Sequence, residues 1–259
     1  MAEYEHVELH VKNRVGWLDY ARPPINAMDW KMVRETHAGV QDHLKNTNVR
    51  VIVIGSALGR FFSAGADIPA FAKMGRAELV DWADLAHTLV HTLRQSDKPL
   101  LAAIHGTAVG GGLEITLHCD LRFAAADARL GQPEININYI PPVGATQALA
   151  RLIGRSRAIR LLYDGKMILA QEAHHIGLVD TLVAPNELRA VVQAYGETLA
   201  AKPPEALAAI QRAVTLGGGM SFDNGLAYER EHIIHLAGTD NFREGLAAFT
   251  EKRAAVWKD

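Results

Sequence analysis

Short apolar runs of strand length alternate with helix-like stretches along most of this chain, and no other feature constrains its fold as strongly. The apolar runs stand at residues 51–55, 100–104, 121–125 and 128–130. Residues 28–44 and 77–95 instead place their apolar side chains at the spacing of one helix face. Alternating strands and helices with short connections favour an α/β fold, in which helices cover apolar sheets.

The two ends of the chain carry different patterns. Residues 7–11 and 14–19 predict an opening hairpin. After Pro185 the strand pattern stops, and the sequence predicts four helices, at residues 187–201, 204–216, 222–236 and 241–258. We therefore expect an α/β core over residues 1–190 and a helical region over residues 191–259.

Composition and charge argue against several classes of function. The 259 residues carry 27 Lys and Arg against 29 Asp and Glu, so the chain lacks the basic excess of a nucleic-acid-binding protein. No apolar run approaches the roughly 18 to 20 residues that a membrane span needs. Cys119 is the only cysteine, and the first residues carry acid where a targeting peptide would carry lysine or arginine. We expect a cytoplasmic protein.

Metal and serine-hydrolase chemistry find little support in the sequence. The 12 histidines include the pairs His87 and His91, and His232 and His235, which are separated by about one helical turn. Neither a cysteine cluster nor a His-Glu-x-x-His motif accompanies them, so we expect no metal site. The chain also lacks the Gly-x-Ser-x-Gly turn that carries the nucleophile of many serine hydrolases.

Two glycine-rich turns follow predicted strands. One contains three consecutive glycines, Gly110 to Gly112, and the other contains Gly65. Each alone is compatible with a tight turn that packs against a sheet. Glycine also allows backbone N–H groups to approach a ligand, and the start of a helix favours negative charge. Two such turns on neighbouring elements can each offer one N–H group to a single carbonyl oxygen, which is the geometry of an oxyanion hole.

Two carboxylates stand near these turns. Glu114 lies in the first turn of the helix that follows the three glycines, and Glu134 follows Pro133. Each alone is explained by a favourable helix-dipole contact or by a solvated loop. If both reach one site, burial and mutual repulsion push their pKa values apart, and the pair can divide acid and base roles.

Taken together, these segments resemble the enoyl-CoA hydratase/isomerase superfamily, also called the crotonase superfamily. The Gly-Gly-Gly-x-Glu element combined with Gly-Gln-Pro-Glu carries the resemblance most specifically. The matching segments cover nearly the whole chain, at residues 26–27, 62–68, 104–120, 132–147 and 249–253. The resemblance implies a spiral of repeated β-β-α units, and a C-terminal helical region that builds homotrimers, often stacked as hexamers.

The resemblance also implies roles for particular residues. The N–H groups of Ala66 and Gly111 would bind the thioester oxygen of an acyl-CoA and stabilise an enolate. Glu114 and Glu134 would activate water and transfer the α-proton, whereas a double-bond isomerase typically keeps only the second carboxylate. The predicted substrate-binding residues are Ala64, Asp67, Ile68, Tyr139, Pro142, Phe249 and Lys252. Coenzyme A is part of the substrate, and no other cofactor is expected.

The chain departs from the family pattern after Glu134. Pro142 falls where a glycine commonly offers an N–H group to the catalytic water, and proline has no such donor. Tyr139 is bulkier than the usual residue and can reshape the acyl pocket. Because both Glu114 and Glu134 are present, hydration of an enoyl-CoA is the first hypothesis. The alternatives are an isomerase, hydrolase or C–C lyase of the same superfamily that acts on an atypical acyl group, and a non-catalytic acyl-CoA-binding protein.

Overall fold

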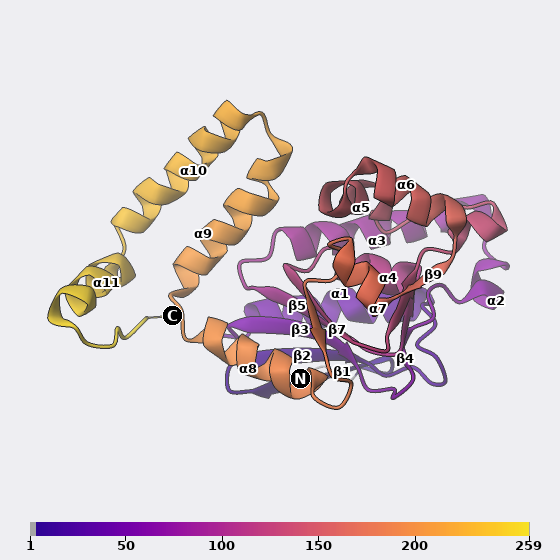
Figure 1. The fold of residues 1–259 in the computed structure, drawn as a ribbon, viewed down its shortest axis with the longest axis horizontal. Coiled ribbons are helices and arrows are strands. Elements are labelled where there is room, and N and C mark those ends of the chain that lie inside the picture. Colours follow the sequence, from indigo (N-terminus) through magenta and orange to yellow (C-terminus); the bar gives the residue numbers. More distant parts are fainter. Residues whose placement is uncertain (1–3, 259) are drawn as a thin grey trace.

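The computed structural model describes residues 4–258, and its core is built on two β-sheets (Figure 1). The larger sheet has six strands in the order β1-β2-β3-β5-β7-β10, and only β1 and β2 run antiparallel. Every residue of β2, β3 and β5 is buried, as expected for parallel strands covered on both faces. The six strands are β1 (Val7–Lys12), β2 (Val15–Tyr20), β3 (Val51–Ser56), β5 (Leu100–Ile104), β7 (Leu121–Ala125) and β10 (Thr181–Val183).

A second sheet of four short strands lies beside the first. Its order is β4-β6-β8-β9, and only β8 and β9 run antiparallel. The strands β4, β6 and β8 each follow a strand of the larger sheet along the chain, so the same β-β step occurs three times. The fold is therefore the expected α/β architecture of β-β-α units. The four strands are β4 (Phe61–Ser63), β6 (Thr107–Val109), β8 (Arg129–Gly131) and β9 (Met167–Leu169).

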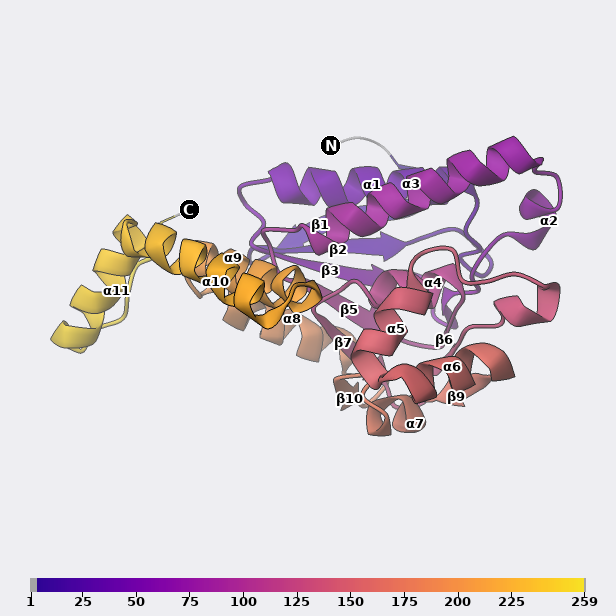
Figure 2. The ribbon, with the colours of Figure 1, turned by 90° about the horizontal axis from the view of Figure 1, so that it is seen from above.

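Helices cover both faces of the larger sheet (Figure 2). On one face, α1 (Trp30–Lys45) and α3 (Arg76–Arg94) pack side by side. On the other face, α8 (Leu188–Ala200) packs against β2, β3, β5 and β7. Arg189 of α8 binds the buried Asp19 carboxylate of β2 with two hydrogen bonds of 2.8 and 2.9 Å. The predicted boundary at residue 190 falls inside α8, and the division into two units stays a prediction.

Short helices follow the strands of the second sheet, and several of them carry the candidate site. The helix α4 follows β6, the 3-10 helix η1 follows β8, and α5 and α6 come next along the chain. No helix within residues 4–258 is long and apolar enough to cross a membrane. The short helices are α2 (Ile68–Phe71), α4 (Gly111–Thr116), η1 (Glu134–Ile137), α5 (Ala145–Ile153), α6 (Arg155–Asp164), α7 (Ala170–His175) and η2 (Gly217–Gly219).

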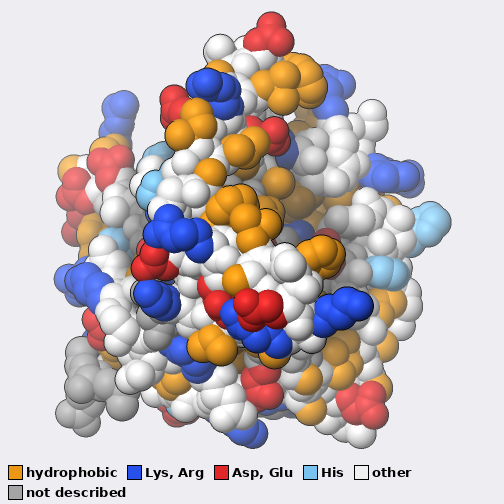
Figure 3. All heavy atoms as spheres, turned by 90° about the vertical axis from the view of Figure 1, so that its left-hand side faces the viewer, with side chains coloured by type: hydrophobic (Ala, Val, Ile, Leu, Met, Phe, Trp, Pro, Cys, Tyr) orange, Lys and Arg blue, Asp and Glu red, His pale blue; other side chains and the backbone are white. Residues whose placement is uncertain are grey.

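The C-terminal helices extend away from the two sheets (Figure 1). They are α9 (Pro204–Thr215), α10 (Phe222–Ala237) and α11 (Asp240–Glu251). The α10 helix has no buried residue, and apolar side chains appear among charged ones on this side of the molecule (Figure 3). Exposed apolar side chains of α10 and α11 include Leu226, Ile233, Ile234 and Phe249.

The last helix is shorter than the sequence predicts. The pattern places a helix over residues 241–258, whereas α11 ends at Glu251. Lys252 has φ +55, in the left-handed region, and the chain then turns back along α11. The N–H group of Val256 donates to Glu244 Oε1 at 2.8 Å, and this contact replaces helical hydrogen bonding. The prediction was wrong because apolar spacing continues past the residue where the backbone reverses.

Candidate active site

A cavity of about 250 Å³ lies where the two glycine-rich turns meet. Ala66 of the first turn, Gly111 of the second turn and the Glu134 side chain all line it. The rest of the lining is largely apolar, so a bound group would be removed from water. Electrostatic interactions with that group would be strong, because the effective dielectric constant of such a cavity is low. The apolar lining includes residues of the first three helices, namely Val33, Phe71, Trp82, Ala86 and Leu89.

The first turn is held in place by the fully buried Asn26. The Asn26 side-chain nitrogen donates to the Phe62 carbonyl oxygen at 3.0 Å. The Asn26 carbonyl oxygen accepts from the Ser63 hydroxyl at 2.7 Å, and Ser63 Oγ in turn accepts from the N–H group of Gly65 at 3.1 Å. This chain of hydrogen bonds fixes the backbone that leads into the cavity wall.

The second turn touches the first and adopts a conformation that favours glycine. Gly110 has φ +53 and Gly65 has φ +80. A Cβ atom at Gly65 would lie 2.9 Å from the Val109 carbonyl oxygen, so the two turns are in close contact. Within residues 4–258, the N–H groups of Ala66 and Gly111 donate to no protein acceptor. Two such donors on one cavity can stabilise an oxygen that gains negative charge.

Glu134 brings a carboxylate to the cavity. It begins η1, directly after Pro133, and its residue surface is only 8% exposed. With its side-chain nitrogen facing this carboxylate, Gln132 donates to Oε2 at 3.1 Å and to Oε1 at 3.2 Å. Burial raises the pKa of Glu134 to about 6. Near neutral pH this group is therefore mainly ionised and able to accept a proton.

Glu114 lies behind the cavity wall and is fully buried. Its Oε2 atom accepts from the N–H groups of Val143 at 2.8 Å and Ala145 at 3.0 Å. Its Oε1 atom meets no hydrogen-bond partner in the described part of the chain. Burial is the main cause, and the charge of Glu134 a lesser one, that raises the pKa of Glu114 to about 8. The two carboxyl groups therefore differ in protonation near neutral pH.

Comparison with known proteins identifies the family. Over residues 10–259 the chain matches the family model described as enoyl-CoA hydratase/isomerase. The chain belongs to the enoyl-CoA hydratase/isomerase family. The superfamily resemblance drawn from the sequence motifs is confirmed.

Named relatives and solved structures agree with this family. The 2,3-dehydroadipyl-CoA hydratase of Escherichia coli (strain K12) is 37% identical and covers 90% of this chain and 89% of its own. The crotonyl-CoA hydratase of Syntrophomonas wolfei is 32% identical, with 97% of each chain covered. A solved enoyl-CoA hydratase from Geobacillus kaustophilus HTA426 superposes with a TM-score of 0.96 at 30% identity, over 99% of this chain and 98% of that one.

The other residues predicted from the family lie in three places. Ala64, Ile68, Tyr139 and Pro142 line the same cavity as Glu134. Asp67 lies outside this lining, where it caps α2 and accepts a hydrogen bond from Arg22 at 2.8 Å. Phe249 and Lys252 are at the end of α11, far from the cavity of their own chain, and Phe249 is 86% exposed (Figure 1).

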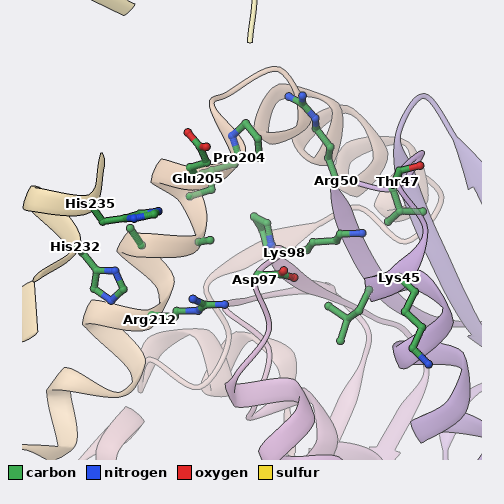
Figure 4. Close-up of a pocket in the computed structure, with 16 residues that line it drawn as sticks. Lys45, Thr47, Arg50, Asp97, Lys98, Pro204, Glu205, Arg212, His232 and His235 are labelled. Atoms are coloured by element: carbon green, nitrogen blue, oxygen red, sulfur yellow. The ribbon is translucent and has the colours of Figure 1, made fainter. Parts of the chain in front are cut away.

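A larger cavity, of about 410 Å³, separates α9 and α10 from the core (Figure 4). Its polar lining includes Arg212, His232 and His235 from the helices and Lys98 from the core. Lys98 Nζ donates to two backbone carbonyl oxygens at 2.9 Å, so it stabilises the core. Among residues 4–258, no glycine lines this cavity. Within residues 4–258, no three His, Cys, Asp or Glu side chains gather closely enough to hold a metal ion.

Sequence reasoning assigned no role to two residues that hold this family's site together here. Asn26 was noted only as part of a matching segment, although its αL conformation (φ +51) and short polar side chain are typical of a structural loop anchor. The sequence gives no sign of a role for His118, because its hydrogen-bond partner, Val143, is 25 residues away. Spacing in the sequence carries no signal for such a contact.

The buried Glu114 predicts a pH-dependent stability. The folded chain holds this proton up to about pH 8, whereas an unfolded chain releases it near the ordinary value of 4.5. The contribution of Glu114 to the free energy of unfolding is therefore most favourable below pH 4.5, and it is lost as the pH rises towards 8. We expect Glu114→Gln to raise the free energy of unfolding by about 3 kcal/mol near pH 9, and to change it little near pH 5.

Urea unfolding of both proteins at the two pH values measures this effect. Glu172→Gln is the matched control, because Glu172 is an exposed acid of α7 whose removal changes the net charge equally. Equal stability of Glu114→Gln and the unmodified protein near pH 9 would contradict the assignment of a raised pKa to Glu114.

Proposed function

We propose that this chain is a hydro-lyase that adds water across the α,β double bond of an enoyl-CoA thioester. The observation that carries the proposal is the meeting of two unpaired N–H groups and the Glu134 carboxylate on one largely apolar cavity, with Glu114 directly behind it. The relatives named above as enoyl-CoA hydratases support the same reaction.

The N–H groups of Ala66 and Gly111 would bind the thioester oxygen. Adding a nucleophile to the β-carbon places negative charge on this oxygen as the enolate forms. Because the donors are fixed by the two turns, they need no reorganisation when the charge develops. Each donor of this kind contributes about 3 kcal/mol of transition-state stabilisation in a site that excludes water.

The two carboxyl groups would move the protons while sharing one proton between them. Near neutral pH the shared proton rests mainly on Glu114, and hydration proceeds from the less populated form of the pair that carries it on Glu134. In that form, Glu114 as carboxylate takes a proton from water as the oxygen of the water bonds to the β-carbon. Protonated Glu134 then delivers its proton to the α-carbon, the enolate collapses, and the thioester is regenerated. The proton gained by Glu114 returns to Glu134 before the next turnover, so atoms and charge balance. The reverse reaction starts with the proton on Glu114.

This division predicts a bell-shaped pH profile for kcat/KM. The active pair carries one proton, so activity falls below about pH 6, where both groups are protonated. Activity also falls above about pH 8, where neither group carries a proton. Initial rates with crotonyl-CoA across pH 5 to 10 measure the two limbs. A profile that is flat from pH 5 to 10 would contradict the shared-proton mechanism.

The retained Glu114 favours hydration over the alternatives. An isomerase of this family needs only the carboxylate at Glu134, and a fully buried second carboxylate would then be costly without a role. Tyr139 and Pro142 line the cavity. The bulk of the Tyr139 ring favours an acyl group that differs from a simple straight chain, and Pro142 supplies no backbone donor to a water molecule. A C–C lyase or hydrolase with the same oxyanion hole, or a protein that only binds acyl-CoA, are the further alternatives.

The proposed function includes a substrate and an oligomeric state. Coenzyme A enters as part of the substrate, and no separate cofactor is needed for this chemistry. Exposed apolar side chains on α10 and α11 support a homotrimer or hexamer, in which Phe249 and Lys252 would reach the coenzyme A bound to a neighbouring subunit. Sedimentation of a clean monomer would contradict this assembly. A cytoplasmic location is the prediction drawn from the cysteine content.

The loss of enoyl-thioester absorbance from crotonyl-CoA tests the proposed reaction. We expect a decrease with the unmodified protein that both Glu114→Gln and Glu134→Gln abolish. Loss of hydration in both variants, with isomerisation surviving in Glu114→Gln, would instead favour an isomerase. Binding of acyl-CoA in a calorimeter, without turnover of straight, branched or cyclic enoyl-CoAs, would favour a non-catalytic protein.

A further inference from the structure

His118 contacts the loop that hydrogen-bonds to Glu114. It follows α4, four residues after Glu114, and its residue surface is 7% exposed. His118 Nε2 lies 2.7 Å from the Val143 carbonyl oxygen. Because a carbonyl oxygen only accepts, Nε2 carries the proton and donates this hydrogen bond. The other ring nitrogen, Nδ1, has no partner within the described residues.

The His118 ring stays neutral at the pH of the reaction. Burial is the main cause that lowers the pKa of His118 to about 4, and the nearby charges of Arg94 and Arg122 act in the same direction. The hydrogen bond to Val143 opposes this change only in part. His118 therefore acts as a fixed neutral donor and does not titrate while the enzyme works.

Glu114 and His118 hold the same loop from two sides. Val143 donates its N–H group to Glu114 and accepts from His118 through its carbonyl oxygen. Ala145 donates a second N–H group to Glu114. Gly144, between them, has φ +92, and a Cβ atom there would lie 3.1 Å from the His118 ring. Consecutive peptide groups of the loop of residues 142–145 therefore hydrogen-bond to Glu114 and His118.

The loop depends on these contacts because Pro142 supplies no N–H group. The donors that remain to orient Glu114 are those of Val143 and Ala145, and they lie in the peptide groups on either side of the one that carries the Val143 carbonyl. Pro142 and Val143 also line the cavity beside Glu134. A displaced loop would therefore change both the carboxylate orientation and the cavity wall.

We propose that His118 is a positioning residue, which fixes the loop of residues 142–145 on Glu114 and so orients this carboxylate for proton transfer. The proposal rests on the proposed function and adds to it a residue outside the cavity lining. His118 touches neither the substrate nor the reacting atoms, and it acts through Val143.

Two substitutions at this site separate positioning from simple packing. His118→Leu keeps a side chain of similar volume but removes the donor, and His118→Gln keeps an N–H donor at similar reach. With crotonyl-CoA we expect His118→Leu to lower kcat about 10-fold to 30-fold with little change in KM, and His118→Gln to recover most of the loss. The upper limb of the pH profile should also move to higher pH in His118→Leu, since Glu114 loses donors that favour its ionised form.

The matched control is His43→Leu. His43 is also a buried histidine whose Nε2 lies close to a backbone carbonyl oxygen, that of Trp17 at 2.9 Å, but it belongs to α1 and lies outside the site. We expect this variant to lower stability without moving the pH limb. An unchanged kcat and pH limb in His118→Leu would overturn the proposal, as would equal effects of the Leu and Gln substitutions.

A measurement without substrate keeps this test independent of the proposed reaction. Carbon-13 NMR of labelled glutamate carboxyl groups, with Glu114→Gln used for assignment, reports the titration of Glu114 directly. We expect its midpoint to rise by about half a pH unit or more in His118→Leu. If crotonyl-CoA is not hydrated but this shift is seen, the proposed function fails and the positioning role stands. An unchanged midpoint would overturn the positioning role.

Discussion

Glu134→Gln is expected to lower kcat for enoyl-CoA hydration about 1000-fold, while KM changes only a few-fold. The carboxylate lines the cavity, and proton transfer to the α-carbon has no other donor in our mechanism. General acid–base groups commonly contribute about 100-fold to 10,000-fold to the rate, and binding of the acyl chain depends on other contacts. Steady-state kinetics with crotonyl-CoA measures the effect.

The control for Glu134→Gln is Glu172→Gln, which removes one exposed carboxylate from α7 and should retain full activity. Near-native circular dichroism and thermal unfolding of Glu134→Gln would show that its fold is intact. A fall of less than about 10-fold would mean that another group transfers the α-proton, and the roles assigned above would then be wrong.

Gly110→Ala is expected to reduce activity at least about 100-fold and to lower stability by about 2 kcal/mol. Gly110 has φ +53 and ψ −135, a region that side chains rarely enter. A Cβ atom there would lie 2.9 Å from Glu134 Oε1. The methyl group would therefore displace the carboxylate, and the backbone change would move the adjacent N–H group of Gly111.

Gly59→Ala is the matched control, because no atom lies within 4 Å of a Cβ at that position and its φ lies outside the left-handed region. Kinetics and urea unfolding of both variants give the comparison. If Gly110→Ala retained activity within about 3-fold of the unmodified protein, the close fit between the second turn and Glu134 would not matter for catalysis.

Most strands of the larger sheet could be predicted from the sequence, whereas β10, at Thr181–Val183, was not predicted. Residues 100–104 and 121–125 are strands over their predicted lengths, as β5 and β7. Buried parallel strands are rich in apolar residues along their whole length, and this gives short apolar runs in the sequence. The helices α1 and α3 were also located to within a few residues, because each has one apolar face against the sheet.

The second sheet was harder to predict. Its strands β4, β6 and β9 have three residues each, and the sequence around β6 reads as a glycine-rich turn. Three residues show no periodicity, and their pairing is decided by contacts with distant parts of the chain. The last residue of α11 was predicted wrongly for a related reason. The chain reverses at Lys252, and the reversal is held by hydrogen bonds to Glu244 and Asn241.

The residues of the candidate site could be predicted from the sequence, but the hydrogen bonds that join them could not. Motifs located the two turns and both glutamates, and the structure brings Ala66, Gly111 and Glu134 to one cavity. The position of Glu114 depends on N–H groups of residues 143 and 145, about 30 positions later in the chain. Such contacts are set by the packing of α4 against the loop before α5, which local sequence does not encode.

The most direct test of the central claim follows atoms from water into the product. Crotonyl-CoA is incubated with the protein in deuterium oxide enriched in oxygen-18, and the products are analysed by mass spectrometry. We predict an intact thioester that gains one oxygen-18 in a hydroxyl group on the β-carbon and one deuterium on the α-carbon. Oxygen-18 in a released carboxylic acid, or a moved double bond without oxygen-18, would contradict hydration by this site.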